Sequence, residues 1–200
     1  MEEIFTRNVP RVRTILKGRK IGIAGCGGLG SNLALNLARM GADTFVLVDF
    51  DKIEPSNLNR QFYFYDQVGL PKAEALKANL LRVVPNLKLE IKQVKLDASN
   101  IISAFTGCVV VAECFDGAGN KALLTEMLIS KKVPVVAVSG LAGDDTPEKI
   151  RIKKPLPFLT LIGDESSPPC EAGLMSARVS TAAAYQAWAI LEVLKNEAKG

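Results

Sequence analysis

One stretch near the start of the chain decides the fold: Lys20-Ile-Gly-Ile-Ala-Gly-Cys-Gly-Gly-Leu-Gly-Ser-Asn32. A short apolar run at 21–24 leads directly into Gly25-Cys-Gly-Gly-Leu-Gly30, and apolar residues at helical spacing follow. A strand, a glycine turn and a helix in this order bring backbone N–H groups and the positive end of a helix to an anionic phosphate. The stretch therefore predicts a nucleotide site, but it does not indicate which nucleotide binds or what is done with it.

The glycines of this turn have separate expected roles. Gly25 would allow the chain to turn tightly, Gly27 would let the backbone approach the ligand, and Gly30 would let the helix pack on the strand. Alone, such a motif is a weak signal, because many unrelated nucleotide-binding proteins share it.

Composition narrows the class of protein. A chain of 200 residues suits one domain, spanning 1–200, and 48% apolar with 23% charged residues is ordinary for a soluble globular protein. The net charge is +4, but the Lys and Arg residues are dispersed, so no nucleic-acid partner is expected. No apolar run is long enough for a membrane span, and the acidic start is unlike a signal peptide. We therefore expect a cytoplasmic location and no membrane partner.

Residue usage also limits the chemistry. The chain has no histidine, which excludes histidine bases, histidine nucleophile pairs and histidine metal ligands. Its four cysteines include no Cys-x-x-Cys pair, so neither a zinc site nor a disulfide framework is expected. Any reaction must use Lys, Arg, Asp, Asn, a Cys or a bound Mg²⁺.

Apolar strands alternate with amphipathic helices along most of the chain, which predicts an α/β fold. This fold is Rossmann-like, with a mostly parallel sheet, helices on both faces and a few antiparallel C-terminal strands. A short helix or arm is expected within 1–19, and a long apolar helix at 174–196 should pack on the sheet or on a second subunit. The expected strands are 21–24, 44–48, 87–92 (at an edge), 108–113, 133–139 and short ones at 149–162 broken by Pro155 and Pro157; the expected helices are 31–40, 71–84, 100–105 and 120–131.

Polar side chains follow the second predicted strand. Asp49 stands 19 residues after Gly30, where a nucleotide-binding fold places an acid that accepts hydrogen bonds from both ribose hydroxyls. Arg60 and Lys72 offer a guanidinium and an ammonium, which can bind β- and γ-phosphates and stabilise a leaving pyrophosphate. Asp116 follows a later buried strand, where it could hold Mg²⁺. These residues predict a site that splits a triphosphate.

Six motifs then carry a resemblance: Gly25-Cys-Gly-Gly-Leu-Gly-Ser-Asn32, Val48-Asp-Phe-Asp51, Ser56-Asn-Leu-Asn-Arg-Gln61, Gly69-Leu-Pro-Lys-Ala-Glu74, Cys114-Phe-Asp116 and Cys170-Glu-Ala-Gly-Leu-Met-Ser176. Their order resembles the ThiF/MoeB family of ubiquitin-activating-enzyme-like adenylyltransferases, in a short ThiF-like branch without the zinc cysteines. The resemblance runs from about Lys20 to Lys195. Six ordered motifs are far more specific than one glycine motif.

The resemblance implies a sulfur carrier protein adenylyltransferase. Such an enzyme binds ATP with Mg²⁺ and the Gly-Gly tail of a small ubiquitin-like carrier, here a ThiS-like protein of thiamine thiazole synthesis. The carrier's C-terminal carboxylate attacks the α-phosphate and gives an acyl-adenylate and pyrophosphate. That carboxylate is already ionised, so no general base is needed and catalysis would rest on positioning and electrostatics.

The resemblance also assigns roles to single residues. The glycine loop would bind phosphate and adenosine, and Asp51 is a further nucleotide contact that could instead merely end its strand. The assigned residues are Gly25, Gly27, Gly28 and Gly30 for the glycine loop, Asp49 for ribose, Asn57, Arg60 and Lys72 for the triphosphate, and Asp116 for Mg²⁺.

Two further candidates are left open. Relatives form two-fold dimers and donate an N-terminal arginine to the partner's ATP, so we expect a homodimer with Arg7, or alternatively Arg11, in that role. A solvated basic face is the other interpretation of these arginines. Cys170, among Gly, Pro and Ser, is either a thiol that reacts in later steps or a structural residue.

Other functions remain possible at this point. The same chemistry could serve a MoaD-like carrier for molybdopterin synthesis, although the missing zinc motif favours the ThiS-type branch. The glycine loop and Asp49 alone would also allow an NAD-binding oxidoreductase or a nucleotide-sensing module, and a purely structural partner protein is a fourth option. Arg60, Lys72 and the lack of any evident hydride-handling residue argue against the oxidoreductase.

Overall fold

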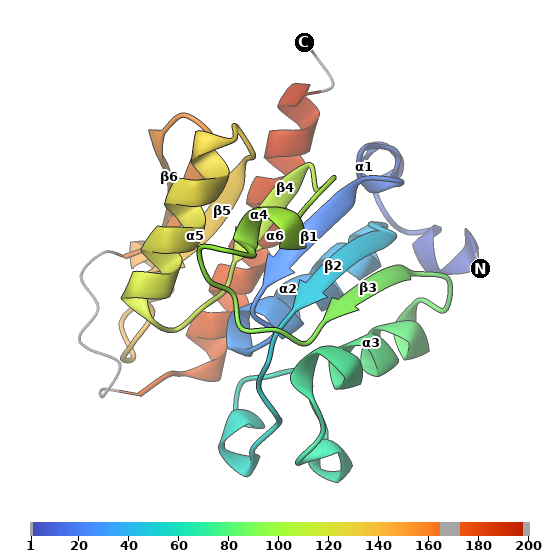
Figure 1. Cartoon of the computed structure of the whole chain (residues 1–200). Coiled ribbons are helices and arrows are strands. Elements are labelled where there is room, and N and C mark those ends of the chain that lie inside the picture. Colours follow the sequence, from blue (N-terminus) through green and yellow to red (C-terminus); the bar gives the residue numbers. More distant parts are fainter. Residues whose placement is uncertain (1, 165–172, 198–200) are drawn as a thin grey trace.

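A seven-stranded sheet runs through the described residues, 2–164 and 173–197, of the computed structural model (Figure 1). The strand order is β3-β2-β1-β4-β5-β7-β6, and neighbouring strands are parallel except β6, which is antiparallel to β7. The predicted fold class is therefore confirmed, with β3 at one edge as expected. The strands are β1 (Lys20–Ala24), β2 (Thr44–Val48), β3 (Lys88–Lys92), β4 (Val110–Glu113), β5 (Val135–Ser139), β6 (Arg151–Leu156) and β7 (Leu159–Gly163).

Helices connect the parallel strands and cover both faces of the sheet. Within the two described ranges, no helix combines the length and the apolar character needed to cross a membrane. The α-helices are α1 (Pro10–Leu16), α2 (Gly28–Met40), α3 (Lys72–Val83), α4 (Ile101–Ala104), α5 (Ala118–Ser130) and α6 (Ser176–Glu197), and the 3-10 helices are η1 (Glu2–Phe5), η2 (Pro55–Asn57), η3 (Tyr65–Gln67) and η4 (Pro147–Lys149).

Two hydrophobic cores lie on opposite faces of the sheet because successive strand residues point to opposite sides. Phe45 and Leu47 belong to the core under α1, α2, α3 and α6, whereas Val46 and Val48 belong to the core under α4 and α5. All four side chains are buried. This two-sided burial explains why the central strands are continuously apolar rather than alternating.

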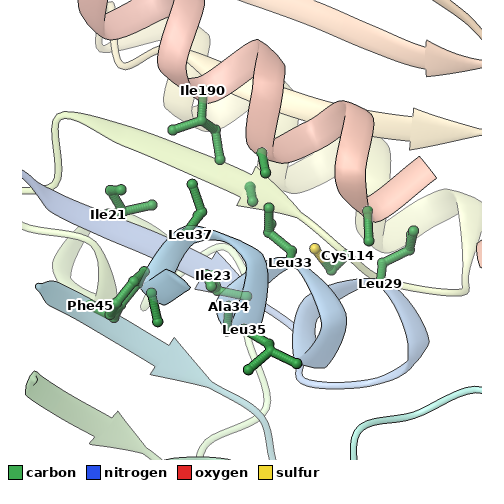
Figure 2. Close-up of a cluster of buried hydrophobic side chains, with 14 of the residues drawn as sticks. Ile21, Ile23, Leu29, Leu33, Ala34, Leu35, Leu37, Phe45, Cys114 and Ile190 are labelled. Atoms are coloured by element: carbon green, nitrogen blue, oxygen red, sulfur yellow. The ribbon is translucent and has the colours of Figure 1, made fainter. Parts of the chain in front are cut away.

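The larger core joins α2 to α6. Leu33 and Leu37 lie on the side of α2 that faces α6, and Ile190 of α6 points back towards them (Figure 2). The buried Gln186 then fastens α6 to the sheet, because its Nε2 donates hydrogen bonds to the carbonyls of Glu113 and Val136. The long apolar helix expected at 174–196 therefore packs on the sheet, which was one of the two arrangements that the sequence allowed.

Two boundaries differ from the sequence-based expectation. The helix expected at 31–40 is α2, and it begins at Gly28 because the glycines of the turn already form its first turn. Pro155 lies inside β6 and does not break it. β6 is an edge strand, where a missing N–H costs no ladder hydrogen bond, and its pairing with β7 is irregular between Lys153 and Leu156.

Candidate functional site

The carboxyl ends of β1, β2 and β4 meet at one edge of the sheet, and each is followed by a candidate residue. Ala24, the last residue of β1, is in register with Val48 on β2 and with Glu113 on β4. Between β1 and β4 the direction of winding reverses, and ligands of open α/β sheets bind at such a switch point. The glycine turn, Asp49 and Asp116 therefore converge on the place where a nucleotide is expected.

Steric limits shape the glycine turn. Gly25 has φ +95°, a left-handed conformation that side chains rarely adopt, so the chain can turn sharply off β1. A Cβ on Gly30 would lie 1.9 Å from the carbonyl oxygen of Gly25, so only glycine lets α2 approach the strand this closely. The turn thus presents the N-terminal end of α2, with its unpaired backbone N–H groups, at the sheet edge.

Asp49 links the turns after β1 and β2. Its Oδ2 accepts a hydrogen bond from the Cys26 N–H (2.6 Å), and its Oδ1 accepts one from the Asp51 N–H (2.8 Å). Burial raises the pKa of this carboxyl, although both backbone N–H groups work in the opposite direction. Each carboxylate oxygen has a second lone pair, so Asp49 could still accept from ribose hydroxyls while holding the glycine turn.

Asp51 and Lys72 form an ion pair beside Asp49. The Lys72 Nζ lies 3.0 Å from the Asp51 Oδ2, and the Lys72 N–H donates to the Asp51 carbonyl (2.9 Å). The Lys72 side chain is 10% exposed and that of Asp51 is 48% exposed. Asp51, expected as a nucleotide contact, therefore holds the ammonium that was expected to bind the triphosphate.

Arg60 lies directly over the start of α2. A Cβ on Gly28 would meet the Arg60 Cγ at 3.4 Å, so the aliphatic part of this side chain covers Gly28. Its Nη1 donates to the Asn59 Oδ1 (2.8 Å) and the Ser56 carbonyl (3.3 Å). Asn57 is buried, and its Oδ1 accepts from the Glu54 N–H (3.1 Å), which shapes η2. The aliphatic part of Arg60 thus lies at the helix N-terminus, where phosphate is expected, and Ser56 and Asn59 hold its guanidinium.

Two hydrogen bonds with the first turns of α2 hold the segment around Gln61 in place, and we call them the straps. The sequence patterns did not predict either one. The Asn32 Nδ2 donates to the Arg60 carbonyl (2.9 Å). The Phe62 N–H donates to the Ser31 Oγ (3.0 Å), which itself donates to the Gly27 carbonyl (2.7 Å). Ser31 and Asn32 directly follow the glycine motif, and this adjacency was the one available signal.

Tyr63 adds a buried link. Its hydroxyl donates to the Cys26 carbonyl (2.6 Å) and lies 3.1 Å from the Lys72 carbonyl, so it joins the glycine turn to the start of α3. Burial raises the pKa of this phenol far above its ordinary value, so the hydroxyl keeps its proton. The sequence showed Tyr63 only as part of an aromatic cluster at 62–65 and gave it no role.

Asp116 is exposed in the connection between β4 and α5. The residues before it are fixed by Glu113, whose buried carboxylate accepts from the Phe115 N–H (2.6 Å) and pairs with the Lys121 Nζ (3.0 Å). Burial raises the pKa of Glu113, and the Lys121 ammonium opposes that shift. One exposed carboxylate suits Mg²⁺, which commonly takes one or two carboxylates together with substrate phosphates.

Two candidates are not brought to this edge. Arg7 is exposed near the C-terminal end of α2, where the Asn8 Nδ2 donates to the Arg39 carbonyl (2.6 Å). The 13-residue α2, roughly 20 Å long, separates it from the glycine turn, and Arg11 on α1 is likewise exposed away from the turn. Cys170 lies outside the described residues. Cys26, Cys108 and Cys114 are buried thiols, and burial raises the pKa of each, to about 11 for Cys108.

Comparison with known sequences identifies relatives over nearly the whole chain. Residues 8–198 match the ThiF family. The chain is 30% identical over 191 residues to the adenylyltransferase and sulfurtransferase MOCS3 of Caenorhabditis briggsae, covering 92% of this chain and 47% of that protein. It is 29% identical over 184 residues to the molybdopterin-synthase adenylyltransferase of Salmonella typhimurium, covering 90% and 74%. The chain thus spans about half the length of the worm protein.

Solved structures share the fold. The E. coli tRNA N6-threonylcarbamoyladenosine dehydratase TcdA has a TM-score of 0.91 at 19% identity, over 99% of this chain and 96% of that one. Its complex with ATP has a TM-score of 0.89 at 20% identity, over 98% and 94%. E. coli MccB with ATP has a TM-score of 0.74 at 20% identity, over 92% and 58%. At these identities the likeness establishes a common fold alone.

Proposed function

Because the chain belongs to the ThiF family, we propose that it activates a carboxylate by transferring the adenylyl group of ATP to it. The observation that carries this proposal is the position of the Arg60 side chain over Gly28, at the N-terminus of α2, with the Lys72 ammonium held by Asp51 beside Asp49. A guanidinium and an ammonium at a phosphate-binding turn suit a reaction that releases pyrophosphate. Hydride transfer itself needs neither group, because no bond to phosphorus breaks in it.

The substrate in this proposal is the C-terminal carboxylate of a small ubiquitin-like sulfur carrier with a Gly-Gly tail. A carboxylate oxygen attacks the α-phosphorus, a bond forms between them, and the bond from that phosphorus to the bridging oxygen of pyrophosphate breaks. The acyl-adenylate stays bound and pyrophosphate leaves with the electron pair. The attacking carboxylate is ionised at neutral pH, so the absence of histidine is no obstacle.

Each residue of the site has a defined task. Asp49 orients ribose, and Asn57 and Arg60 hold the triphosphate over the start of α2. Lys72 exchanges part of its contact with Asp51 for phosphate oxygens, which stabilises charge on the leaving group. Asp116 would hold Mg²⁺, and that ion would neutralise phosphate charge when bound. The rate enhancement comes from positioning and electrostatic stabilisation rather than from a covalent enzyme intermediate.

For the carrier, we propose a ThiS-like protein of thiamine thiazole synthesis in the cytoplasm. The chain has no Cys-x-x-Cys pair, which supports the branch without zinc. A MoaD-like carrier is the second candidate, supported by the 29% identity to a molybdopterin-synthase adenylyltransferase over 90% of this chain. The carrier with which the chain pairs distinguishes these two candidates.

We also propose that the chain works as a homodimer. Arg7 lies at the far end of α2 from its own glycine turn, so a role for it in ATP binding requires a second copy. Tyr185 and Trp188 of α6 are 36% and 62% exposed and offer an apolar surface for such a partner.

ATP–pyrophosphate exchange with purified protein tests the activity. We expect exchange that depends on an added Gly-Gly carrier, fastest with the ThiS-like one, and absent with the same carrier lacking its terminal glycine. Arg60→Ala should reduce exchange at least a hundredfold, whereas exposed Arg151→Ala should leave it unchanged. Exchange without any carrier, or stabilisation by NAD but not by ATP, would overturn the proposal.

A further inference from the structure

One buried polar atom at the site has no partner. The Gln61 side chain is 9% exposed, and its Oε1 is the buried side-chain nitrogen or oxygen within the described ranges that makes no hydrogen bond. A buried acceptor without a partner loses its hydrogen bonds to water and gains none in return. Natural proteins keep few such atoms, and those that occur call for an explanation, such as a ligand that completes the hydrogen bond.

The straps fix where this side chain points. On one side of Gln61 the Arg60 carbonyl accepts from Asn32, and on the other side the Phe62 N–H donates to Ser31. The backbone of Gln61 is also paired, since its N–H donates to the Asn57 carbonyl (3.0 Å). With both neighbours pinned to the first turn of α2, the Gln61 carboxamide is held over the glycine turn.

The Nε2 of this carboxamide borders room that a ligand could use, and a half turn about the terminal bond of the side chain would place Oε1 there instead. A Cβ on Gly27 would meet nothing nearer than the Gln61 Nε2, at 3.7 Å, which is an ordinary van der Waals distance. Packing within the protein therefore does not require glycine at position 27. The unused room lies above the N-cap of α2, where an anionic group would bind.

We propose that the Gln61 carboxamide turns towards a substrate that lies over Gly27, so that Oε1, enclosed in the ligand-free protein, accepts a hydrogen bond from a ligand N–H or O–H. This inference rests on the proposed adenylyl transfer, which brings two such donors to the turn. One is a ribose hydroxyl of ATP, and the other is the peptide N–H of the terminal glycine of the carrier. In the second case, Gln61 would hold the attacking carboxylate against the α-phosphate.

Gln61→Met is the test, because Met has similar length and no hydrogen-bonding group. In the ligand-free protein we expect an unchanged or raised Tm, since the variant removes an unsatisfied polar atom. We also expect about a tenfold loss at one of two steps. A weaker Kd for ATP identifies the ribose hydroxyl as the donor, and a higher carrier KM with unchanged ATP affinity identifies the peptide N–H.

Gln67 provides a matched control in the same connection. Its carboxamide is fully paired, because its Nε2 donates to the Asn79 Oδ1 (2.7 Å) and its Oε1 accepts from the Asn79 Nδ2 (2.9 Å). Gln67→Met should therefore show the opposite pattern. We expect a lower Tm, with the ATP Kd and the carrier KM of the folded protein changed by less than about twofold.

The results separate the two proposals. If Gln61→Met lowers the Tm as Gln67→Met does and leaves both ligand constants unchanged, Gln61 is a structural residue and the inference is wrong. In that case, wild-type exchange activity would still support adenylyl transfer. If the wild-type protein binds ATP but exchanges no pyrophosphate with any carrier, the proposed adenylyl transfer is wrong. The ATP Kd of Gln61→Met then still shows whether Gln61 binds a ribose hydroxyl. A wild-type protein that binds neither ATP nor carrier overturns both.

Discussion

At the scale of single residues, two positions in the same turn require glycine for different reasons, one for the fold and the other for the ligand. Gly30 is required by the fold, because a Cβ there would overlap the Gly25 carbonyl at 1.9 Å. At Gly27 a Cβ would make only an ordinary contact with Gln61, so the protein itself tolerates it. We expect the bound substrate to use the free room at Gly27.

We therefore expect Gly30→Ala and Gly27→Ala to separate folding from binding. Gly30→Ala should lower the free energy of unfolding by about 3 kcal/mol or more, because backbone must shift to relieve the overlap. Gly27→Ala should keep a near-native Tm and bind ATP at least tenfold more weakly. Urea denaturation and isothermal titration calorimetry measure the two effects. Equal losses of stability in both variants would contradict this division.

If Asp49 binds the ribose as we propose, nucleotide binding should depend on pH. Burial raises its pKa above the ordinary value of 3.8, so it takes up a proton at a higher pH than an exposed aspartate. The ionised form accepts hydrogen bonds from ribose. Affinity is therefore complete above the raised pKa and is lost as the pH falls through it. Adenosine, which carries no phosphate to titrate, should bind progressively more weakly on acidification from pH 7.

The matched variant is Asp49→Asn, which cannot titrate. Its adenosine affinity should be lower than that of the wild type at neutral pH and flat over the same range. A wild-type Kd that stays constant down to pH 4, in protein that circular dichroism shows to be folded, would refute the assigned role of Asp49.

At the scale of elements, the site depends on attaching the connection between β2 and α3 to the first turn of α2. The Ser31 Oγ makes this attachment, because it accepts from the Phe62 N–H and donates to the Gly27 carbonyl. Arg60 and Gln61 lie just before that contact. Their positions over the glycine turn therefore depend on Ser31.

Ser31→Ala should loosen this connection. It leaves the Phe62 N–H without its acceptor, so we expect a loss of about 1–2 kcal/mol in the free energy of unfolding. Amide exchange of residues 59–63 should accelerate, and the KM for ATP should rise severalfold. Exposed Ser103, whose Oγ donates to the nearby Asn100 carbonyl, provides the control. If Ser103→Ala changes the stability, the amide exchange of residues 59–63 and the KM for ATP as much as Ser31→Ala does, the hydrogen bond from Phe62 to Ser31 does not position the site.

Periodic patterns predicted most elements, because apolar strands and amphipathic helices are determined by neighbouring residues. The same patterns placed Asp49 and Asp116 beyond strand ends, where the structure has them. They could not predict that Ser31 reaches Phe62 or that Tyr63 reaches Cys26, since such contacts join residues 31 and 37 positions apart. They also placed the start of α2 too late, because glycine is a poor helix former and only its contact with β1 requires it there.

At the scale of the whole molecule, the exposed side of α6 is the surface we expect to pair two chains. Trp188 is 62% exposed although Ile190 and Leu191 on the same helix are buried. Trp188→Lys should convert a dimer to a monomer in light scattering after size exclusion, with the Tm changed little because the side chain is already exposed. Phe158→Lys, at an exposed aromatic on the β6–β7 turn, should leave the dimer intact. A wild-type monomer at micromolar concentration would contradict the dimer.

The contact between α2 and α6 also has a consequence for how the protein is made. Synthesis proceeds from the N-terminus, so the glycine turn, Asp49 and Lys72 leave the ribosome long before α6. Until then the apolar side of α2 that carries Leu33 and Leu37 has no cover. The nascent chain therefore exposes this hydrophobic surface until α6 has been synthesised, and α2, which begins at the glycine turn, gains its final packing only then.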